Sequence, residues 1–149
     1  MSPPVTPLFT LSREDTPCLL VGRWHGPTPD DSLYPSYERI LAEAKAHGNC
    51  RFWLLDMRER AWHSVAFARW YGELLAHQVV QELGSPVFVA YVAAEAHRTA
   101  IESATTQAML RQASQAEFYP YFFSNETDAR HWLGYYQAHP TPPPKLPQE

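Results

Sequence analysis

Apolar residues occur in short runs that alternate with helical periods along most of the chain. The first two runs, at 8–13 and 18–24, flank the turn-forming segment Glu-Asp-Thr-Pro at 14–17. Two β-like runs joined by a short turn are typical of an antiparallel hairpin. We therefore predict that the chain opens with a pair of antiparallel strands.

Three later runs predict further strands. Those at 52–57 and 87–92 are almost entirely apolar, as in strands covered on both faces. The third, at 118–123, is aromatic and contains Pro120, which has no amide proton to donate. This last strand is therefore expected at an edge of the sheet.

Between these runs, apolar residues recur at the spacing i, i+3, i+4, i+7 that marks one face of a helix. Helices are predicted from Asp30, Asp31 or Ser32 as the cap to Gly48, from Ser64 to Gly84, over 95–115, and from Asn125 through Tyr136. The helix after Ser64 is expected to turn Phe67, Tyr71, Leu74, Leu75 and Val79 inward. The helix over 95–115 is expected to turn Ile101, Ala104, Ala108 and Met109 inward.

The predicted order is β-β-α-β-α-β-α-β-α. Strands joined through helices belong in a mostly parallel sheet with right-handed crossovers, so the fold class is α/β with a mixed sheet and some α+β character. A single domain is expected over 8–139. Residues 1–7 and the proline-rich tail at 140–149 are expected to be disordered ends.

Three segments carry a resemblance to a known fold: F-W-L-L-D-M-R at 52–58, V-F-V-A-Y-V-A-A at 87–94 and F-Y-P-Y-F-F-S-N-E-T-D-A-R-H-W-L at 118–133. Together with the element order, they resemble the SpoIIAA-like fold of STAS domains, which Sec14-type lipid-binding domains share more distantly. The resemblance implies a bacterial, regulatory, non-catalytic binding module. Anti-sigma antagonists of this fold carry a phosphorylatable serine in a D-x-S sequence. Here Arg58 follows Asp56 at that position, so a phospho-switch is not predicted.

Asp56 ends the strand predicted at the centre of the sheet, where open α/β sheets bind ligands. Arg58, Trp62, His63 and Ser64 follow it and combine charge, a stacking surface and an imidazole. These five residues form the candidate ligand- or partner-binding site. The alternative is that Asp56 pairs with Arg58 or Arg60, or accepts loop amides, while Trp62 covers the sheet and Ser64 caps a helix.

Other chemistry has little support in the sequence. The seven histidines form no H-x-H or H-x-x-x-H pair, and the glycines form no phosphate-binding loop, so neither a metal nor a cofactor is predicted. No G-x-S-x-G sequence is present. A small hydrolase or transferase using Asp56 with His63 or His97 is kept as an alternative. A second alternative is a carrier of apolar, lipid-like ligands, and this function requires an enclosed cavity of several hundred Å³.

Cys18 and Cys50 are the only cysteines, and they form no C-x-x-C pair. We expect both to be reduced thiols, with a disulfide as the alternative. The first residues lack the basic and apolar regions of a signal peptide, which favours a cytoplasmic protein.

Composition narrows the range of partners. The net charge of -4 disfavours non-specific nucleic-acid binding, and no apolar run is long enough for a membrane span. Aromatic residues make up 13% of the chain. A surplus of this kind forms an interface or lines a ligand-binding groove, or it fills gaps beside the alanine-rich helix over 95–115. We expect self-association, as a homodimer, and keep a different protein partner as the alternative.

Overall fold

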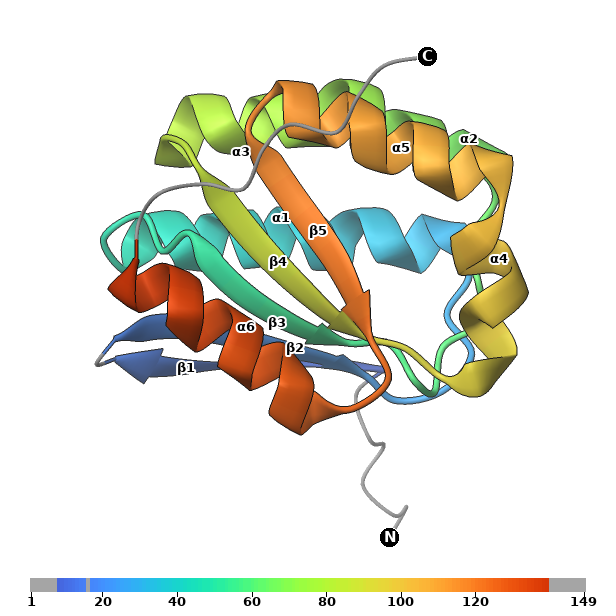
Figure 1. Ribbon diagram of the computed structural model, residues 1–149, viewed down its shortest axis with the longest axis horizontal. Helices are drawn as coiled ribbons and strands as arrows, with labels where there is room; N and C mark the ends of the chain where they lie inside the picture. The colour runs from blue at the N-terminus through green and yellow to red at the C-terminus, as the bar shows by residue number, and fades with distance from the viewer. Residues whose placement is uncertain (1–7, 16, 140–149) are drawn as a thin grey trace, which may run out of the picture.

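The computed structural model describes residues 8–15 and 17–139. Over these residues, five strands form one sheet in the order β1-β2-β3-β4-β5 (Figure 1). Their bounds are Phe9–Asp15, Cys18–Trp24, Phe52–Asp56, Val87–Val92 and Phe118–Phe123. β1 pairs antiparallel with β2, and all later neighbours are parallel. The predicted hairpin, parallel sheet and single domain over the described residues are confirmed. The two terminal segments predicted to be disordered lie outside the described residues.

Helices connect the parallel strands. Their bounds are α1 Asp30–Ala46, α2 Val65–Trp70, η1 Tyr71–Leu75, α3 Ala76–Leu83, η2 Glu95–His97, α4 Arg98–Glu102, α5 Ala104–Gln115 and α6 Glu126–Ala138. The segments α2, η1 and α3 form one continuous helical stretch whose middle turn is a π-helix. No helix among the described residues is long and apolar enough to cross a membrane.

The two faces of the sheet are covered unequally. On one face, α1, the α2–α3 stretch and α5 enclose the larger hydrophobic core, which includes Trp24, Trp53, Tyr37 and Phe67. On the opposite face, the core is built on Ala129 and Leu133 of α6, which packs on β3, β4 and β5 (Figure 1). One helix cannot cover a five-stranded sheet, so aromatic side chains beside α6 stay only partly buried.

The strand predicted at 52–57 is central in the sheet and the strand predicted at 118–123 is at an edge, as expected from the sequence. β3 is the middle strand of the five and delivers Asp56 to its carboxyl end. β5 is an edge strand, and Pro120 lies in its middle, opposite Val89 of β4. The proline is tolerated because only one side of β5 has a partner strand.

The inward face of the helix after Ser64 was predicted wrongly at Leu74, which is 62% exposed, whereas Leu75 is buried. The cause is the π-turn over Tyr71–Leu75, which holds more residues than an α-turn and shifts the helix phase. Phe67, Tyr71, Leu75 and Val79, each four residues apart, remain buried as a result.

The single helix predicted over 95–115 is also wrong. It is broken at Ser103, whose hydroxyl accepts from the amide of Thr106 and begins α5 with a new phase. Ala104 and Ala108, predicted inward, are therefore exposed, while Met109 is buried as predicted.

Helix caps were predicted well at two of three positions. Ser64 accepts from the amide of Phe67, and Asn125 accepts from the amide of Asp128 at 2.8 Å. For α1 the prediction was wrong, because Pro29 is the cap residue and offers no side-chain oxygen. Asp30 and Asp31 lie instead inside the first turn, where negative charge favours the helix N-terminus.

Cys18 and Cys50 form a disulfide bond, so the expectation of two reduced thiols was wrong. The bond joins the start of β2 to the segment before β3, and its sulfur atoms lie at the end of these parallel strands opposite Asp56. The disulfide is the alternative that the sequence left open, and it joins two positions that are 32 residues apart in the chain.

Candidate functional site

The Asp56 carboxylate is fully engaged by arginines. Oδ1 accepts from the backbone amide of Arg58 at 3.1 Å and from its Nε at 2.9 Å. Oδ2 accepts from Nη2 of Arg58 at 2.7 Å and from Nη1 of Arg23 at 2.8 Å. Burial opposes ionisation, but the Arg58 hydrogen bonds outweigh it and keep the pKa of Asp56 below its ordinary value.

The ion pairs extend from Asp56 to α6. Arg23 lies 2.9 Å from Glu126, and Arg130 contacts both Glu126, at 2.8 Å, and Glu14 of β1. Hydrogen bonding from Arg23 lowers the pKa of Glu126. This chain of alternating charges fastens the first turns of α6 to the ends of β2 and β3. The sequence offered Asp56 either as part of a binding site or as the partner of Arg58 or Arg60. In the structure Asp56 pairs with Arg58, and Arg60 takes no part in this chain of ion pairs.

Arg60 turns to the other face of the sheet and is only 2% exposed. Its guanidinium carbon lies 4.3 Å from the centre of the Trp24 ring, a cation–π contact. Nε and Nη1 are buried without a hydrogen-bond partner among the described residues. Within residues 8–15 and 17–139, no carboxylate forms an ion pair with this guanidinium.

A chain of three tyrosine hydroxyls lies beside Arg60. The hydroxyl of Tyr91 is hydrogen-bonded to that of Tyr37, and it donates to that of Tyr71 at 2.9 Å. All three side chains are buried, and burial raises the pKa of each. The hydroxyls therefore stay protonated at neutral pH. Together with Arg60 they form a polar cluster inside an otherwise aromatic core.

His63 separates this cluster from the surface. Its ring stacks on Trp62 with centroids 4.5 Å apart, and both ring nitrogens are buried without a hydrogen-bond partner among the described residues. Burial, followed by the positive charge of Arg60, lowers the pKa of His63 to about 3. The imidazole is therefore neutral across the physiological range.

His97 fixes the position of the loop that carries Arg60. Its Nδ1 accepts from the amide of Ala94 at 3.1 Å, so its Nε2 carries the proton and donates to the carbonyl of Arg60 at 2.9 Å. Ser64 is hydrogen-bonded to Asp30 and caps α2. His97 and Ser64 are thus positioned by hydrogen bonds to other residues rather than by contact with Asp56.

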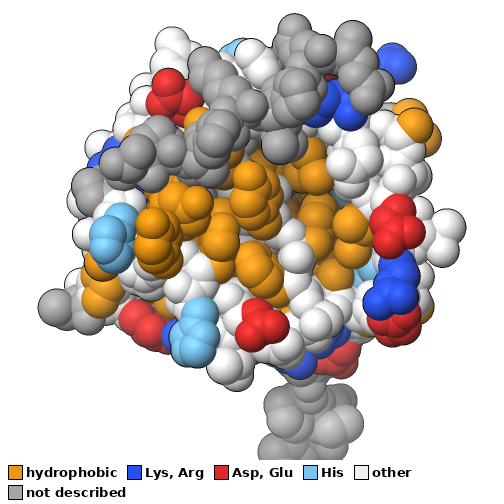
Figure 2. All heavy atoms as spheres, in the orientation of Figure 1, with side chains coloured by type: hydrophobic (Ala, Val, Ile, Leu, Met, Phe, Trp, Pro, Cys, Tyr) orange, Lys and Arg blue, Asp and Glu red, His pale blue; other side chains and the backbone are white. Residues whose placement is uncertain are grey.

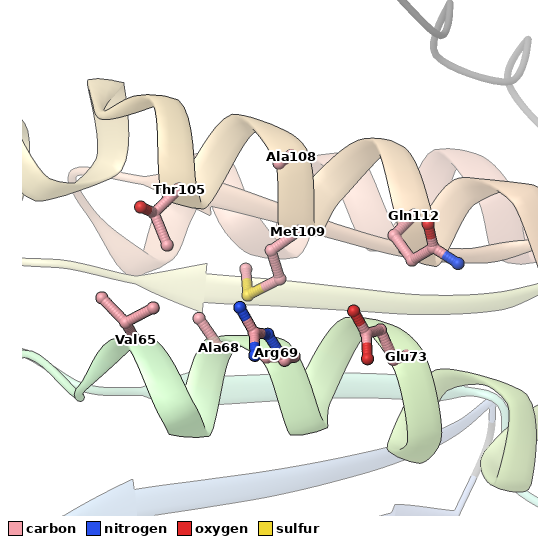
Figure 3. A pocket seen from close by; sticks show the side chains of 8 residues that line it. All are labelled: Val65, Ala68, Arg69, Glu73, Thr105, Ala108, Met109 and Gln112. Carbon is pink, nitrogen blue, oxygen red and sulfur yellow. The ribbon is translucent and has the colours of Figure 1, made fainter.

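Two adjoining hollows run along α2 on the side that faces α4 and α5. The first, which we call the outer groove, has a volume of about 410 Å³ and is lined by Trp62, His63, Ser64, Val65, Ala68, Ala96, Thr99, Ala100, Ser103, Thr105 and Thr106. The second, of about 320 Å³, shares Val65, Ala68 and Thr105 with it. Figure 3 shows this second hollow between α2 and α5, with Met109 reaching into it and Arg69 and Glu73 on the helix opposite.

A much smaller cavity lies beneath them. It has a volume of about 10 Å³, which is room for about one water molecule or one oxygen atom of a ligand. We call it the inner cavity. Its lining is the polar cluster and its neighbours: Tyr37, Arg60, His63, Phe67, Tyr71, Tyr91, Met109 and Phe122. His63 lines both the inner cavity and the outer groove. A single imidazole therefore borders the open space on one side and the buried guanidinium on the other.

The five residues predicted as a site are therefore divided by the structure. Trp62, His63 and Ser64 line the outer groove, whereas Asp56 and Arg58 belong to the ion-pair chain. Neither His63 nor His97 is hydrogen-bonded to Asp56 in the described part of the chain. The arrangement expected for the hydrolase or transferase alternative is not assembled. Nor do the described residues include a group of three or more histidine, cysteine or acidic side chains placed to hold a metal ion.

Arg60 was not among the candidate site residues predicted from the sequence. In the sequence it stands in a polar segment after the strand, where an arginine is expected to be solvated. Its burial depends on Trp24 and Tyr37, which come from elements far away in the chain. The one local indication is Trp62-His63 two residues later, an aromatic pair that covers the loop from outside.

The aromatic residues fall into two groups. Trp24, Tyr37 and Tyr71 are fully buried, and Tyr34, Trp62 and Trp70 pack against the same core, so these six mainly fill it. A second group on β5 and α6 is less covered, and we call it the aromatic surface: Tyr121, Phe123, Trp132, Tyr135 and Tyr136. Figure 2 shows apolar side chains gathered on this face of the molecule.

Comparisons with known proteins support the fold alone. No family model and no curated protein matches the chain. Among solved structures, the chain is similar to an uncharacterized protein of the DUF3478 family with a SpoIIAA-like fold from Shewanella loihica PV-4. The two are 18% identical, the match covers 89% of this chain and 98% of the other, and the TM-score is 0.50. The chain has a SpoIIAA-like fold, as the sequence resemblance implied.

Proposed function

We propose that this SpoIIAA-like domain is a non-catalytic module that binds a small organic ligand in the outer groove. The observation that carries the proposal is the groove itself. Its volume of about 410 Å³ lies within the range of small-molecule sites. Its lining combines a tryptophan with threonine and serine hydroxyls, which supply a stacking surface and hydrogen bonds. Trp62, His63 and Ser64 would contact the ligand, and Asp56 with Arg58 would hold the loop that presents them.

The engagement of the reactive groups supports a non-catalytic role. The Asp56 carboxylate already accepts four hydrogen bonds from two arginines, which makes it a weak base and a poor nucleophile. His63, with its pKa at about 3, is not poised for proton transfer near neutral pH. These two observations favour binding over catalysis at this place in the fold.

An apolar-ligand carrier has less support than a binding module. A carrier encloses its ligand, but the most enclosed of the hollows described above is the inner cavity, whose volume is only about 10 Å³. The outer groove lies along the surface of α2 and presents several hydroxyls. A ligand bound there would keep contact with solvent.

Filling the groove tests the proposal. Ala100 of α4 lines the groove, so Ala100→Trp places an indole in it. Ala42→Trp adds the same side chain to the exposed side of α1 and is the matched control. In a fragment screen monitored by NMR, we expect hits that shift the Trp62 indole signal in the wild type and in the control but not in Ala100→Trp. Two results would contradict a ligand site in this groove. One is that the hits still shift the Trp62 indole signal in Ala100→Trp, and the other is that the screen gives no hits.

We also propose that the aromatic surface mediates self-association, which would give the expected homodimer. Tyr135 is 57% exposed, and it contacts Tyr136, which packs with Trp132. Aromatic side chains of this kind are enriched at protein interfaces. The second copy is the proposed occupant because one helix leaves this face of the sheet incompletely covered. A cytoplasmic location and a regulatory role remain predictions from the sequence.

Light scattering at micromolar concentration measures the association. The double variant Tyr121→Ser, Tyr135→Ser is expected to be a monomer while the wild type is a dimer. Leu74→Ser is the control, since it removes an exposed apolar side chain from a different helix. A wild-type mass equal to that of one chain would exclude the proposal.

A further inference from the structure

The inner cavity holds more hydrogen-bond donors than acceptors. Tyr37, Tyr91 and Tyr71 provide three hydroxyl protons for the two hydrogen bonds that link their oxygens, so one proton is left over. Arg60 adds the N–H groups of Nε and Nη1, which have no partner among the described residues. The neutral His63 ring contributes one more donor and one acceptor. A group that only accepts hydrogen bonds is what this lining lacks.

The charge of the cavity agrees with this donor excess. Arg60 is 2% exposed and contacts the face of Trp24, but no described carboxylate approaches it. A buried cation without a counter-charge is unfavourable unless an anion or polar group compensates it. The indole face and the side-chain hydrogen bond to Tyr37 compensate only part of the charge, because neither provides a hydrogen-bond acceptor for Nε and Nη1. An anionic oxygen at this point would satisfy both deficits.

We propose that the inner cavity is a carboxylate subsite, in which Arg60 and the tyrosine hydroxyls hold one carboxylate oxygen of a small organic monoanion whose uncharged body lies in the outer groove. The inference deepens the function proposed above and rests on it. It names the chemical class of the ligand and the residue that selects it.

The shape of the two spaces favours a carboxylate over a larger anion. The inner cavity, at about 10 Å³, admits one terminal oxygen, so the rest of the acid group has to fit beside His63, where a flat carboxylate needs less room than a tetrahedral phosphate or sulfate. His63 lines both spaces, so the rest of the ligand has to leave the cavity along this ring. The eleven residues around the outer groove include no arginine, lysine, aspartate or glutamate. A second charged group on the ligand would find no partner there.

Two tryptophans allow the subsite and the groove to be observed separately. The Trp24 ring lies against Arg60, and its Nε1 donates to Ser36, so its indole signal reports on the inner cavity. Trp62 lines the outer groove and reports on the ligand body. The probes are benzoate, its neutral analogue benzamide, and chloride, each titrated at constant ionic strength maintained with sodium sulfate and followed by NMR.

We expect benzoate to shift both indole signals with one saturation curve, and benzamide to shift Trp62 alone. Arg60→Met should weaken benzoate binding about tenfold or more, because charge-assisted hydrogen bonds are lost, while benzamide binding changes less than about twofold. Arg98→Met removes the same charge from a side chain that is 67% exposed, and it should leave both affinities unchanged. If Arg60→Met does not fold, the comparison of benzoate with benzamide on the wild type decides alone.

The results that would contradict the carboxylate subsite differ from those that would contradict a ligand site in the outer groove. If benzamide shifts Trp24 as benzoate does, the groove binds ligands but the carboxylate subsite is wrong. If chloride shifts Trp24 and benzoate does not displace it, the cavity holds a single-atom anion and the carboxylate class is wrong. If none of the probes shifts either signal, the subsite is refuted. The groove proposal is then judged by its own fragment screen with Ala100→Trp.

Discussion

The hydroxyl oxygen of Tyr91 lies 2.9 Å from that of Tyr71, and it is also hydrogen-bonded to that of Tyr37. Tyr91 is therefore the middle of the chain, and Tyr91→Phe removes both hydrogen bonds while leaving two buried hydroxyls behind. We expect a loss of about 1–3 kcal/mol in the free energy of unfolding, measured by urea denaturation. Tyr34→Phe, whose hydroxyl makes no hydrogen bond in the described part of the chain, should cost much less. Equal losses in the two variants would contradict the network.

Stability should depend on the Asp56 carboxylate at low pH. Its pKa is lower in the folded protein than in the unfolded chain, so the stabilisation is complete above the unfolded value of about 4 and is lost as the pH falls through the folded value. Asp56→Asn should be about 1–3 kcal/mol less stable at pH 7 and should lose less stability on acidification than the wild type. The control Asp15→Asn alters an ion pair in which Asp15 is 70% exposed, and it should be nearly neutral. Parallel stability–pH curves for wild type and Asp56→Asn would show that the ion pairs do not hold the carboxylate.

The disulfide should contribute through the loop that it closes. Cys18 and Cys50 are separated by 32 residues, a loop that includes all of α1. In the chain-entropy account, the cross-link stabilises the fold by about 3–4 kcal/mol. Urea midpoints measured with and without dithiothreitol should differ accordingly in the wild type and coincide in the variant Cys18→Ala, Cys50→Ala. If reductant leaves the wild-type midpoint unchanged, the bond is absent in solution or has no effect on stability.

The π-turn makes a prediction for two adjacent leucines. Leu75 is 3% exposed and Leu74 is 62% exposed, although a regular helix would have placed both inward. Leu75→Ala should destabilise the protein by about 2–5 kcal/mol, and Leu74→Ala by less than about 0.5 kcal/mol. Thermal or urea unfolding of the pair provides the measurement, with each variant the control for the other. Comparable losses would indicate a continuous α-helix in solution.

The strands and their order could be predicted because their signals are local. A run such as 87–92 is apolar at every position, and all six residues are buried. The helix phases could not be predicted with the same success. The wide turn at 71–75 and the break at Ser103 each shift every residue after them, and neither position stands out in the sequence.

The residues that line the candidate groove could be predicted only in part, for a related reason. Trp62, His63 and Ser64 could be assigned to one loop because they are consecutive, and all three line the groove. The opposite wall comes from α4 and α5, whose phase was predicted wrongly at Ala104. Arg60 could not be recognised, since its surroundings are assembled from α1, α2, η1, β4, α5 and β5, which are scattered along the chain.

The proline in the middle of β5 limits the ways in which copies of this protein can assemble. An added strand would need a row of free amide donors along the sheet margin, and Pro120 interrupts that row. The opposite margin, β1, ends in the exposed charged residues Arg13, Glu14 and Asp15. Both borders of the sheet therefore discourage fibril-like extension, and any stable oligomer has to be built from side chains rather than from a shared backbone ladder.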